Sequence, residues 1–161
     1  NFRMTRENLL DRIQLVAGNI HRMPGDLEPA AAADAYEAEL KKFFGAGLPR
    51  FDLIFLGLGE DGHTASLFPG SAALELSERL VAAVYVEKLR SHRLTLTLAA
   101  INAAAEIVFL IAGASKTAIV KEIFSGAAGY PAPRVGPPRG RLVWMMDSDA
   151  AAGLPRSAAA E

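Results

Sequence analysis

Short apolar runs alternate along the chain with segments in which apolar residues recur three and four positions apart. A continuous apolar run is typical of a strand buried on both faces, whereas the longer spacing indicates one face of a helix. The pattern predicts strands over residues 51–56, 80–86, 93–98, 107–112 and 142–146, and helices over 4–17, 28–44, 99–105 and 116–124. Strands that alternate with helices indicate an α/β sandwich around a mostly parallel sheet.

Three of the predicted helices have an apolar face. The residues expected to point inward are Leu9, Leu10, Ile13 and Val16 in the first, Tyr36, Leu40, Phe43 and Phe44 in the second, and Ile119, Val120, Ile123 and Phe124 in the last. Residues 23–25 predict a turn, residues 126–140 a loop rich in Gly and Pro, and the alanine-rich tail after Asp147 one short helix. The sequence shows no internal repeat and no interdomain linker, so residues 1–161 are expected to form a single domain.

Composition narrows the class of protein. With 161 residues, of which 51% are apolar and 22% charged, the chain has the composition of a globular domain with a sizeable core. The net charge is −1, from 17 basic and 18 acidic side chains, and predicts neither nucleic-acid nor membrane binding. The sequence contains no cysteine, which excludes disulfides, thiolate metal sites and a cysteine nucleophile. Without a signal-peptide pattern or a long apolar run, the expected setting is a reducing cytoplasm.

The stretch FDLIFLGLGEDGHTASLFPGS, residues 51–71, places titratable side chains directly after a predicted buried strand. In open α/β sheets, ligands bind outside the carboxyl ends of the strands. Histidine suits general-base chemistry near neutral pH, Asp61 is close enough in sequence to orient the ring of His63, and Gly62 permits a tight turn. We therefore predict Asp61 and His63 as catalytic residues, with a solvent-exposed histidine in a polar loop as the alternative. His21 and His92 lack such a setting and are expected at the surface.

The same stretch fits the GxGxxG pattern of dinucleotide sites over residues 57–62. Two observations argue against that function. Glu60 and Asp61 would place carboxylates where a pyrophosphate should lie, and Pro69-Gly70 would end the helix whose N-terminus such a site requires. We therefore do not expect a dinucleotide.

A second candidate is Gly113-Ala114-Ser115-Lys116, which follows another apolar strand and opens a helix. Backbone N–H groups there can bind an anion, and a bound phosphate would compensate the positive charge of Lys116, although a solvated lysine is an equal alternative. Arg93 is a weaker candidate for a binding residue, because an arginine at the start of a strand is usually a surface charge. Three scattered histidines predict no metal site, and without a GxSxG motif Ser66 is not expected to form a triad with His63.

The segment GLGEDGHTASLFPGS resembles the signature loop of the 6-phosphogluconolactonases. Later segments are similar to the same family in the same order: RLTLT, IVFLIAGASKTAIV, YPAPRV and LVWMMD. The opening NFRMTRENLL also resembles the family. This resemblance implies a three-layer α/β/α sandwich with a Rossmann-like, mostly parallel sheet, of the isomerase/lactonase/CoA-transferase type.

The resemblance implies hydrolysis of 6-phosphoglucono-δ-lactone to 6-phosphogluconate in the pentose phosphate pathway, with a sugar-phosphate lactone as the small-molecule partner and with no cofactor or metal. His63 would be the general base, and Asp61 would orient it or bind a substrate hydroxyl. Lys116, with Arg93 as a weaker candidate, would bind the phosphate. Gly57 and Gly59 would let the backbone approach the sugar.

Two alternatives stay open. One is an amino-sugar-phosphate deaminase/isomerase on the same fold, whose loop resembles DGH with a glutamate five residues beyond the histidine; here that position is Phe68. The other is a non-catalytic sugar-phosphate-binding fragment. It arises because the family's N-terminal Gly-Gly-Ser/Thr-Pro loop and Asp-Glu-Arg segment have no match, so that the chain corresponds to the C-terminal two-thirds of the domain. For such a fragment we expect an exposed sheet edge that favours association, and for the full domain a monomer.

Overall fold

Strand β4 (Glu106–Ile111) is the centre of a three-stranded parallel sheet in the order β1-β4-β5, formed with β1 (Ile54–Leu56) and β5 (Arg141–Met146). The computed structural model describes residues 2–155. In the register of the sheet, Leu56 lies beside Phe109, which lies beside Trp144. Two further strands, β2 (Val81–Val86) and β3 (Ser91–Leu96), form a separate antiparallel hairpin. The predicted strands are therefore all present, and parallel pairing is confined to three of them.

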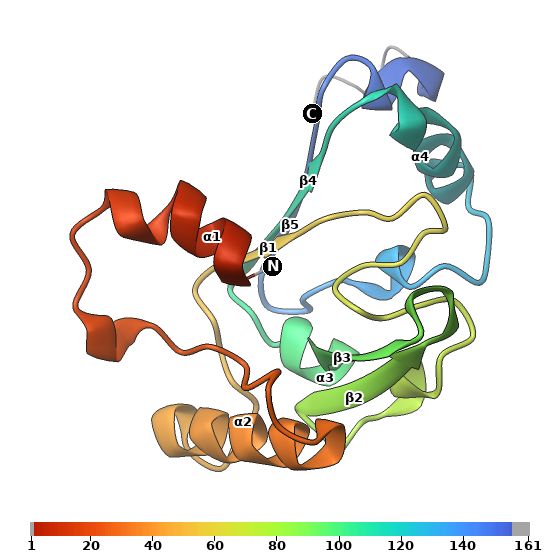
Figure 1. Ribbon diagram of the computed structural model, residues 1–161. Helices are drawn as coiled ribbons and strands as arrows, with labels where there is room; N and C mark the ends of the chain where they lie inside the picture. The colour runs from red at the N-terminus through yellow and green to blue at the C-terminus, as the bar shows by residue number, and fades with distance from the viewer. Residues whose placement is uncertain (1, 156–161) are drawn as a thin grey trace.

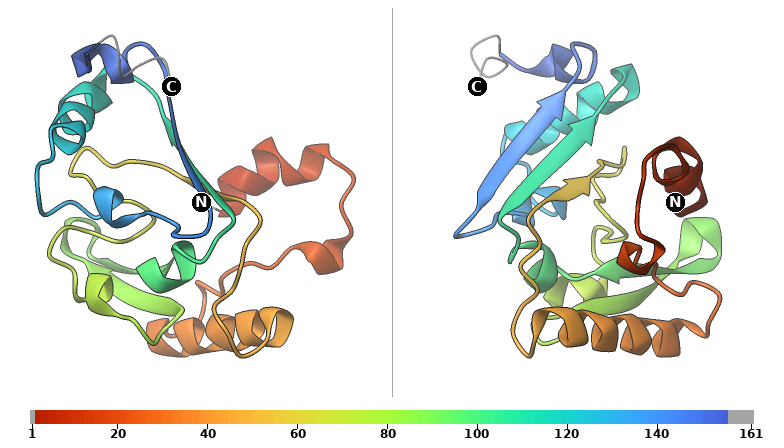
Figure 2. Two further views of the ribbon diagram at one scale, coloured as in Figure 1. Left: turned by 180° about the vertical axis from the view of Figure 1, so that it is seen from behind. Right: turned by 90° about the vertical axis from the view of Figure 1, so that its left-hand side faces the viewer.

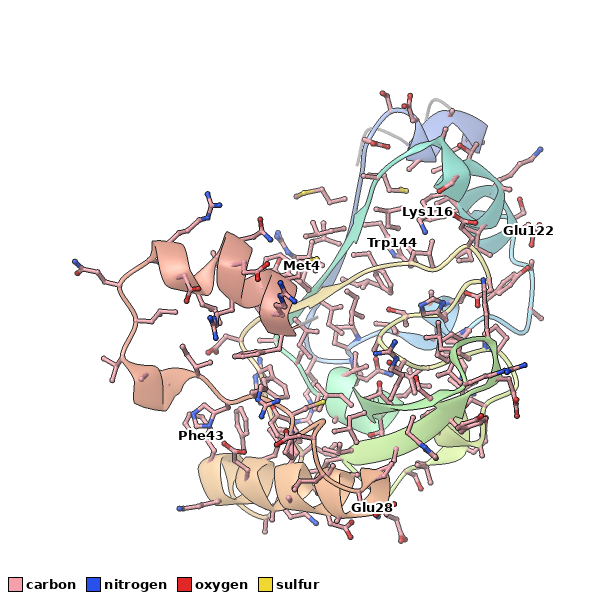
Figure 3. The ribbon with its side chains drawn as sticks, in the orientation of Figure 1. Met4, Glu28, Phe43, Lys116, Glu122 and Trp144 are labelled. Carbon is pink, nitrogen blue, oxygen red and sulfur yellow. The ribbon has the colours of Figure 1, made fainter. Side chains whose placement is uncertain are left out.

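The sheet lies between two helices, as expected for this fold class. Helix α4 (Thr117–Phe124) covers one face and α1 (Phe2–Asn8) lies beside the other, as the edge-on view in Figure 1 and the turned view in Figure 2 show. On the α4 side, Phe109 stacks on Trp144 with 4.1 Å between ring centroids, and Figure 3 places Trp144 between the sheet and α4. The α/β class with a Rossmann-like parallel sheet is confirmed.

A second core joins the remaining long helix to the hairpin. Helix α2 (Pro29–Phe44) packs against β2 and β3, and its buried Ala33 and Leu40 contact buried Leu80 and Val81. A carboxylate oxygen of Glu28 accepts hydrogen bonds from two N–H groups of the first turn, and Gly45, with φ +86°, ends the helix. The helix predicted over 28–44 is confirmed, except that Phe43 is 71% exposed and points away from the core.

The helix predicted over residues 4–17 is wrong in length. The structure has α1 followed by two 3-10 turns, η1 (Leu10–Arg12) and η2 (Ala17–Asn19), and Leu9, Ile13 and Val16 are exposed. Apolar spacing stabilises a helix only where the apolar face has a packing partner. Among residues 2–155, only Leu10 of that face is half-buried, and the other three side chains stay exposed.

The strand predicted over 51–56 is also shorter, and it is not buried on both faces. Only the three residues of β1 pair with β4, and Phe55 is 61% exposed. Leu110 and Met145, on the same side of the neighbouring strands, are exposed as well. On the α1 side of the sheet the apolar side chains of Phe55, Leu110 and Met145 are thus exposed, whereas Val108 among them is buried.

The other elements differ from the prediction by small shifts. Helix α3 spans only Leu98–Ile101, and α4 leaves Phe124 43% exposed while Ile119, Val120 and Ile123 are buried. The remaining 3-10 turns are η3 (Ala72–Glu75), η4 (Glu87–Leu89), η5 (Ala114–Lys116), η6 (Ala132–Arg134) and η7 (Ala150–Gly153). The last of these is the predicted C-terminal helix; the tail from 156 onward lies outside the described residues. None of the helices in the described residues is both long enough and apolar enough to cross a membrane.

Candidate active site

Parallel strands bring the two predicted sites to one edge of the sheet. The loop with His63 follows β1, and Lys116 follows the adjacent β4, at the start of α4 (Figure 3). His63 and Lys116 line one cavity of about 890 Å³ together with Gly57 and Gly59. This is the edge at which α/β sheets bind ligands, as the sequence predicted.

A direct hydrogen bond joins His63 to Asp61. The ring Nδ1 lies 2.5 Å from the Asp61 Oδ1, which also accepts the backbone N–H of His63 at 3.2 Å. An ionised carboxylate can only accept, so Nδ1 donates the proton of this hydrogen bond, and in the neutral tautomer that results Nε2 is the nitrogen able to accept a proton. The arrangement orients the ring so that Nε2, the nitrogen that does not face Asp61, is the one that can act as a general base.

The charge state of Asp61 supports this assignment. Burial opposes ionisation of the carboxyl, but the hydrogen bonds from the ring and backbone of His63, with the charge of that ring, outweigh it. Together they hold the pKa of Asp61 below its ordinary value. Asp61 is therefore ionised at neutral pH and remains an acceptor for Nδ1.

Two glycines make room for this pair. A Cβ on Gly59 would lie 2.0 Å from His63 Nδ1 and 2.6 Å from Asp61 Oδ1. Gly62 has φ +76°, and a Cβ there would lie 2.3 Å from the ring of Tyr130. Gly57 has no such neighbour. A side chain at position 59 would therefore collide with the His63–Asp61 pair itself. Both Gly57 and Gly59 line the cavity, and their role of leaving the backbone open to a ligand stays a prediction.

The substitution Gly59→Ala is expected to break the bond between His63 and Asp61 without unfolding the protein, because the obstructed atoms belong to side chains that can move. Nitrogen-detected NMR of the histidine rings should show loss of the hydrogen-bonded Nδ1–H signal of His63. Gly47→Ala, at a glycine with no atom near the added Cβ, should leave that signal in place. An unchanged signal in Gly59→Ala would contradict the close approach.

Hydrogen bonds made by the side chains of two threonines hold the loop that follows His63. The Thr64 hydroxyl donates to the carbonyl of Gly57 at 2.9 Å, and Thr64 and Leu67 exchange two backbone hydrogen bonds. The N–H of Ser66 donates to the Thr95 hydroxyl of β3 at 3.2 Å. Between them Ala65 has φ +51°, a left-handed conformation that is costly for a residue with a side chain. The loop thus holds a strained turn at the wall of the cavity.

The surroundings of Lys116 narrow the set of backbone N–H groups that could bind an anion. The N–H of Gly113 donates to Asp147 Oδ2 at 2.9 Å, and that of Lys116 donates to the carbonyl of Gly113 in the η5 turn. These two N–H groups are therefore not available to an anion. The side chain of Lys116 is half-buried and makes no hydrogen bond or ion pair within the described residues. Within this segment the groups able to face an anion are therefore the ammonium of Lys116 and the backbone N–H groups of Ala114 and Ser115, which make no hydrogen bond within the described residues.

Arg93 is not brought to the same cavity. It is exposed on β3 and lines a neighbouring cavity of about 420 Å³, which meets the first at Met23, Ser66 and Leu94. The sequence identified its strand but not the antiparallel pairing that directs Arg93 to this side. Within residues 2–155, no His and acidic side chains gather in a group able to bind a metal ion.

The sequence analysis missed three residues of the site. Ser66 and Thr95 line the cavity, and Phe68 stacks on the His63 ring with 4.4 Å between centroids and 27° between planes. Ser66 was considered only as a nucleophile, and among the described residues its hydroxyl makes no hydrogen bond to His63. The position of Thr95, a polar residue in the middle of a strand with alternating apolar residues, was the one sequence signal that could have indicated a role at the site.

Comparison with known proteins identifies the family of the chain. The sequence model of the family described as glucosamine-6-phosphate isomerases/6-phosphogluconolactonase matches residues 1–144. The 6-phosphogluconolactonase of Synechocystis is 45% identical over 96% of this chain and 66% of its own length. The chain thus spans just under two-thirds of that relative.

Solved structures show the same relationship. The crystal structure of the devB protein is 34% identical, with a TM-score of 0.89 over 96% of this chain and 67% of that one. The 6-phosphogluconolactonase of Trypanosoma brucei is 29% identical, with a TM-score of 0.76 over 96% of this chain and 68% of that one. The chain therefore belongs to the glucosamine-6-phosphate isomerase/6-phosphogluconolactonase family.

Proposed function

We propose that this protein hydrolyses 6-phosphoglucono-δ-lactone to 6-phosphogluconate, in the pentose phosphate pathway, with His63 as general base. The observation that carries the proposal is the His63–Asp61 hydrogen bond at the edge of a cavity that is also lined by Lys116, whose side chain has no partner among residues 2–155. The names of the relatives in the family supply the substrate class.

The chemistry needs little beyond a positioned base. A lactone is an activated ester, so Nε2 of His63 takes a proton from water as the water oxygen attacks the carbonyl carbon. The resulting tetrahedral intermediate collapses by breaking the bond to the ring oxygen, and the imidazolium returns the proton to that oxygen. Asp61 stabilises the imidazolium while it exists and keeps the ring in one tautomer. Gly57 leaves the backbone of the cavity wall accessible to the sugar.

Lys116 is the proposed phosphate ligand. Lys116→Ala should raise KM about 10- to 100-fold with a smaller change in kcat, because a hydrogen bond to a charged group contributes about 1.5–3 kcal/mol. Lys121→Ala removes an exposed lysine from the same helix and should leave KM unchanged. Arg93→Ala should have a smaller effect than Lys116→Ala, because Arg93 lines the neighbouring cavity. Equal KM values for Lys116→Ala and the unsubstituted protein would contradict the assignment.

The test of the function is the rate of lactone hydrolysis, coupled to oxidation of the 6-phosphogluconate formed and compared with the spontaneous reaction. Acceleration by the 161-residue chain supports the proposal. A folded chain that binds 6-phosphogluconate without accelerating hydrolysis would instead be the non-catalytic sugar-phosphate-binding protein.

The stacking of Phe68 on His63 argues against the amino-sugar-phosphate deaminase. An apolar ring occupies the space beside the histidine and cannot carry a proton. We therefore expect no release of ammonia from glucosamine 6-phosphate under conditions in which the lactone is hydrolysed.

A further inference from the structure

The ring of His63 has two distinct contacts. Asp61 holds one edge through Nδ1, and Phe68 lies against one face, with its ring tilted by only 27°. The His63 side chain is 33% exposed, so it has no deep packing to immobilise it otherwise. A single hydrogen bond fixes one atom of the ring and leaves the ring free to tilt about that atom. The stacked face removes this freedom.

Phe68 is itself held in place by its neighbours in the chain. Leu67, directly before it, is fully buried and bonded to Thr64 through the backbone. The carbonyl of Phe68 accepts the N–H of Ser71 at 3.0 Å, across a turn in which Gly70 has φ +73°. The backbone on both sides of Phe68 is therefore held in place, which limits where its ring can lie beside His63.

We propose that Phe68 is a positioning residue that aims His63 and stabilises the charge His63 acquires when it takes a proton from water. This inference rests on the proposed function of His63. A neutral imidazole gains dispersion from the stack, and an imidazolium gains in addition the attraction of a cation to the face of an aromatic ring. The contact is thus stronger when the proton has been transferred, and an interaction of that kind raises kcat.

The experiment compares three substitutions at one position. Phe68→Ala should lower kcat about 3- to 10-fold and leave KM within about twofold, a loss matched to the strength of an aromatic pair. Phe68→Leu, which restores bulk without a ring, should be impaired to a similar degree, and Phe68→Tyr should restore kcat. Full activity in Phe68→Leu, or an effect confined to KM, would overturn the proposal.

A control separates positioning from general destabilisation. Phe44→Ala removes a half-buried ring with two aromatic neighbours at 4.9 Å that does not line the cavity of His63, and it should lower the melting temperature without changing kcat. If kcat in Phe44→Ala falls as much as in Phe68→Ala, loss of aromatic packing anywhere would explain the effect, and the proposal is wrong.

NMR of the His63 ring tests the positioning role of Phe68 separately from the proposed lactone hydrolysis. In the folded protein without substrate, Phe68→Ala should abolish the ring-current shift of the His63 protons and move its nitrogen shifts toward those of averaged tautomers. Nitrogen shifts that stay at single-tautomer values would show that Asp61 alone positions the ring, and would overturn the proposal. If instead the ring responds as expected but the unsubstituted chain accelerates no hydrolysis, the proposed function fails and the positioning by Phe68 stands.

Discussion

His63→Asn is expected to lower kcat for lactone hydrolysis by about 10²- to 10⁴-fold, the usual contribution of a general base. Asparagine fills similar space and retains a polar side chain, but it cannot accept a proton from water near neutral pH. KM should change little, since binding of the phosphate is assigned to Lys116. The measurement is the coupled assay at saturating substrate, after subtraction of the spontaneous rate.

The matched control is the same substitution at His92. That ring is exposed on β3, packs against Tyr85 at 5.0 Å between centroids, and lies outside the cavity of His63. His92→Asn should therefore keep the full rate. A His63→Asn protein that hydrolyses the lactone as fast as the His92→Asn protein would exclude His63 as the base.

Asp61→Asn should give a smaller but related loss. The amide can still lie beside Nδ1, but it carries no charge to stabilise the imidazolium, and its N–H₂ group can turn toward the ring and select the wrong tautomer. The contribution of Asp61 therefore depends on His63, and the double substitution should be no slower than His63→Asn alone.

The sequence predicted well those strands and helices that are specified by residues close together in the chain. The fully apolar run at 107–112 became β4, shifted by one residue, and the capped, alanine-rich segment at 28–44 became α2. The helix expected over 4–17 failed because Leu9, Ile13 and Val16 have an apolar spacing but no packing partner within the described residues. Periodicity describes a face; it does not establish that anything covers it.

The same distinction applies to the site. Asp61 and His63 are two residues apart, so their hydrogen bond was within reach of sequence reasoning. Placing Lys116 in the same cavity required knowing that β1 and β4 are adjacent and parallel. Phe68 could not be predicted, because a residue five positions along an irregular loop has no period that fixes where its ring lies.

The largest expected loss of stability is at Glu37, a 6% exposed carboxylate that joins α2 to the start of β2. One oxygen accepts from Lys41 at 2.7 Å, and the other accepts from Arg79 and from the backbone N–H of Leu80 at 2.9 Å each, and from that of Val81 at 3.3 Å. Glu37→Ala leaves two buried N–H groups and an arginine without this acceptor. The free energy of unfolding should fall by about 3–5 kcal/mol.

The pH dependence of stability tests the charge of Glu37 separately from its shape. Burial opposes ionisation, but the bonds from Lys41, Arg79 and the two N–H groups outweigh it and lower the pKa from 4.5 to about 2. Because the folded-state pKa is depressed, the stabilisation is complete above the unfolded-state pKa and is lost as pH falls toward the folded-state value. Between pH 7 and pH 3 the unsubstituted protein should lose about 2 kcal/mol more than Glu37→Gln does.

Urea unfolding at the two pH values measures both quantities, and Glu39→Gln is the control. Glu39 lies on the same helix and pairs with His21, but both side chains are 43% exposed, so its replacement should change stability by at most about 1 kcal/mol. The pKa of the Asp61 carboxyl is lowered as well. Asp61 is present in every variant and contributes equally to the acid dependence of each, so its contribution cancels in the comparison. If Glu37→Gln and the unsubstituted protein lose stability in parallel from pH 7 to pH 3, the charge of Glu37 does not hold α2 to β2, and its contribution is packing alone.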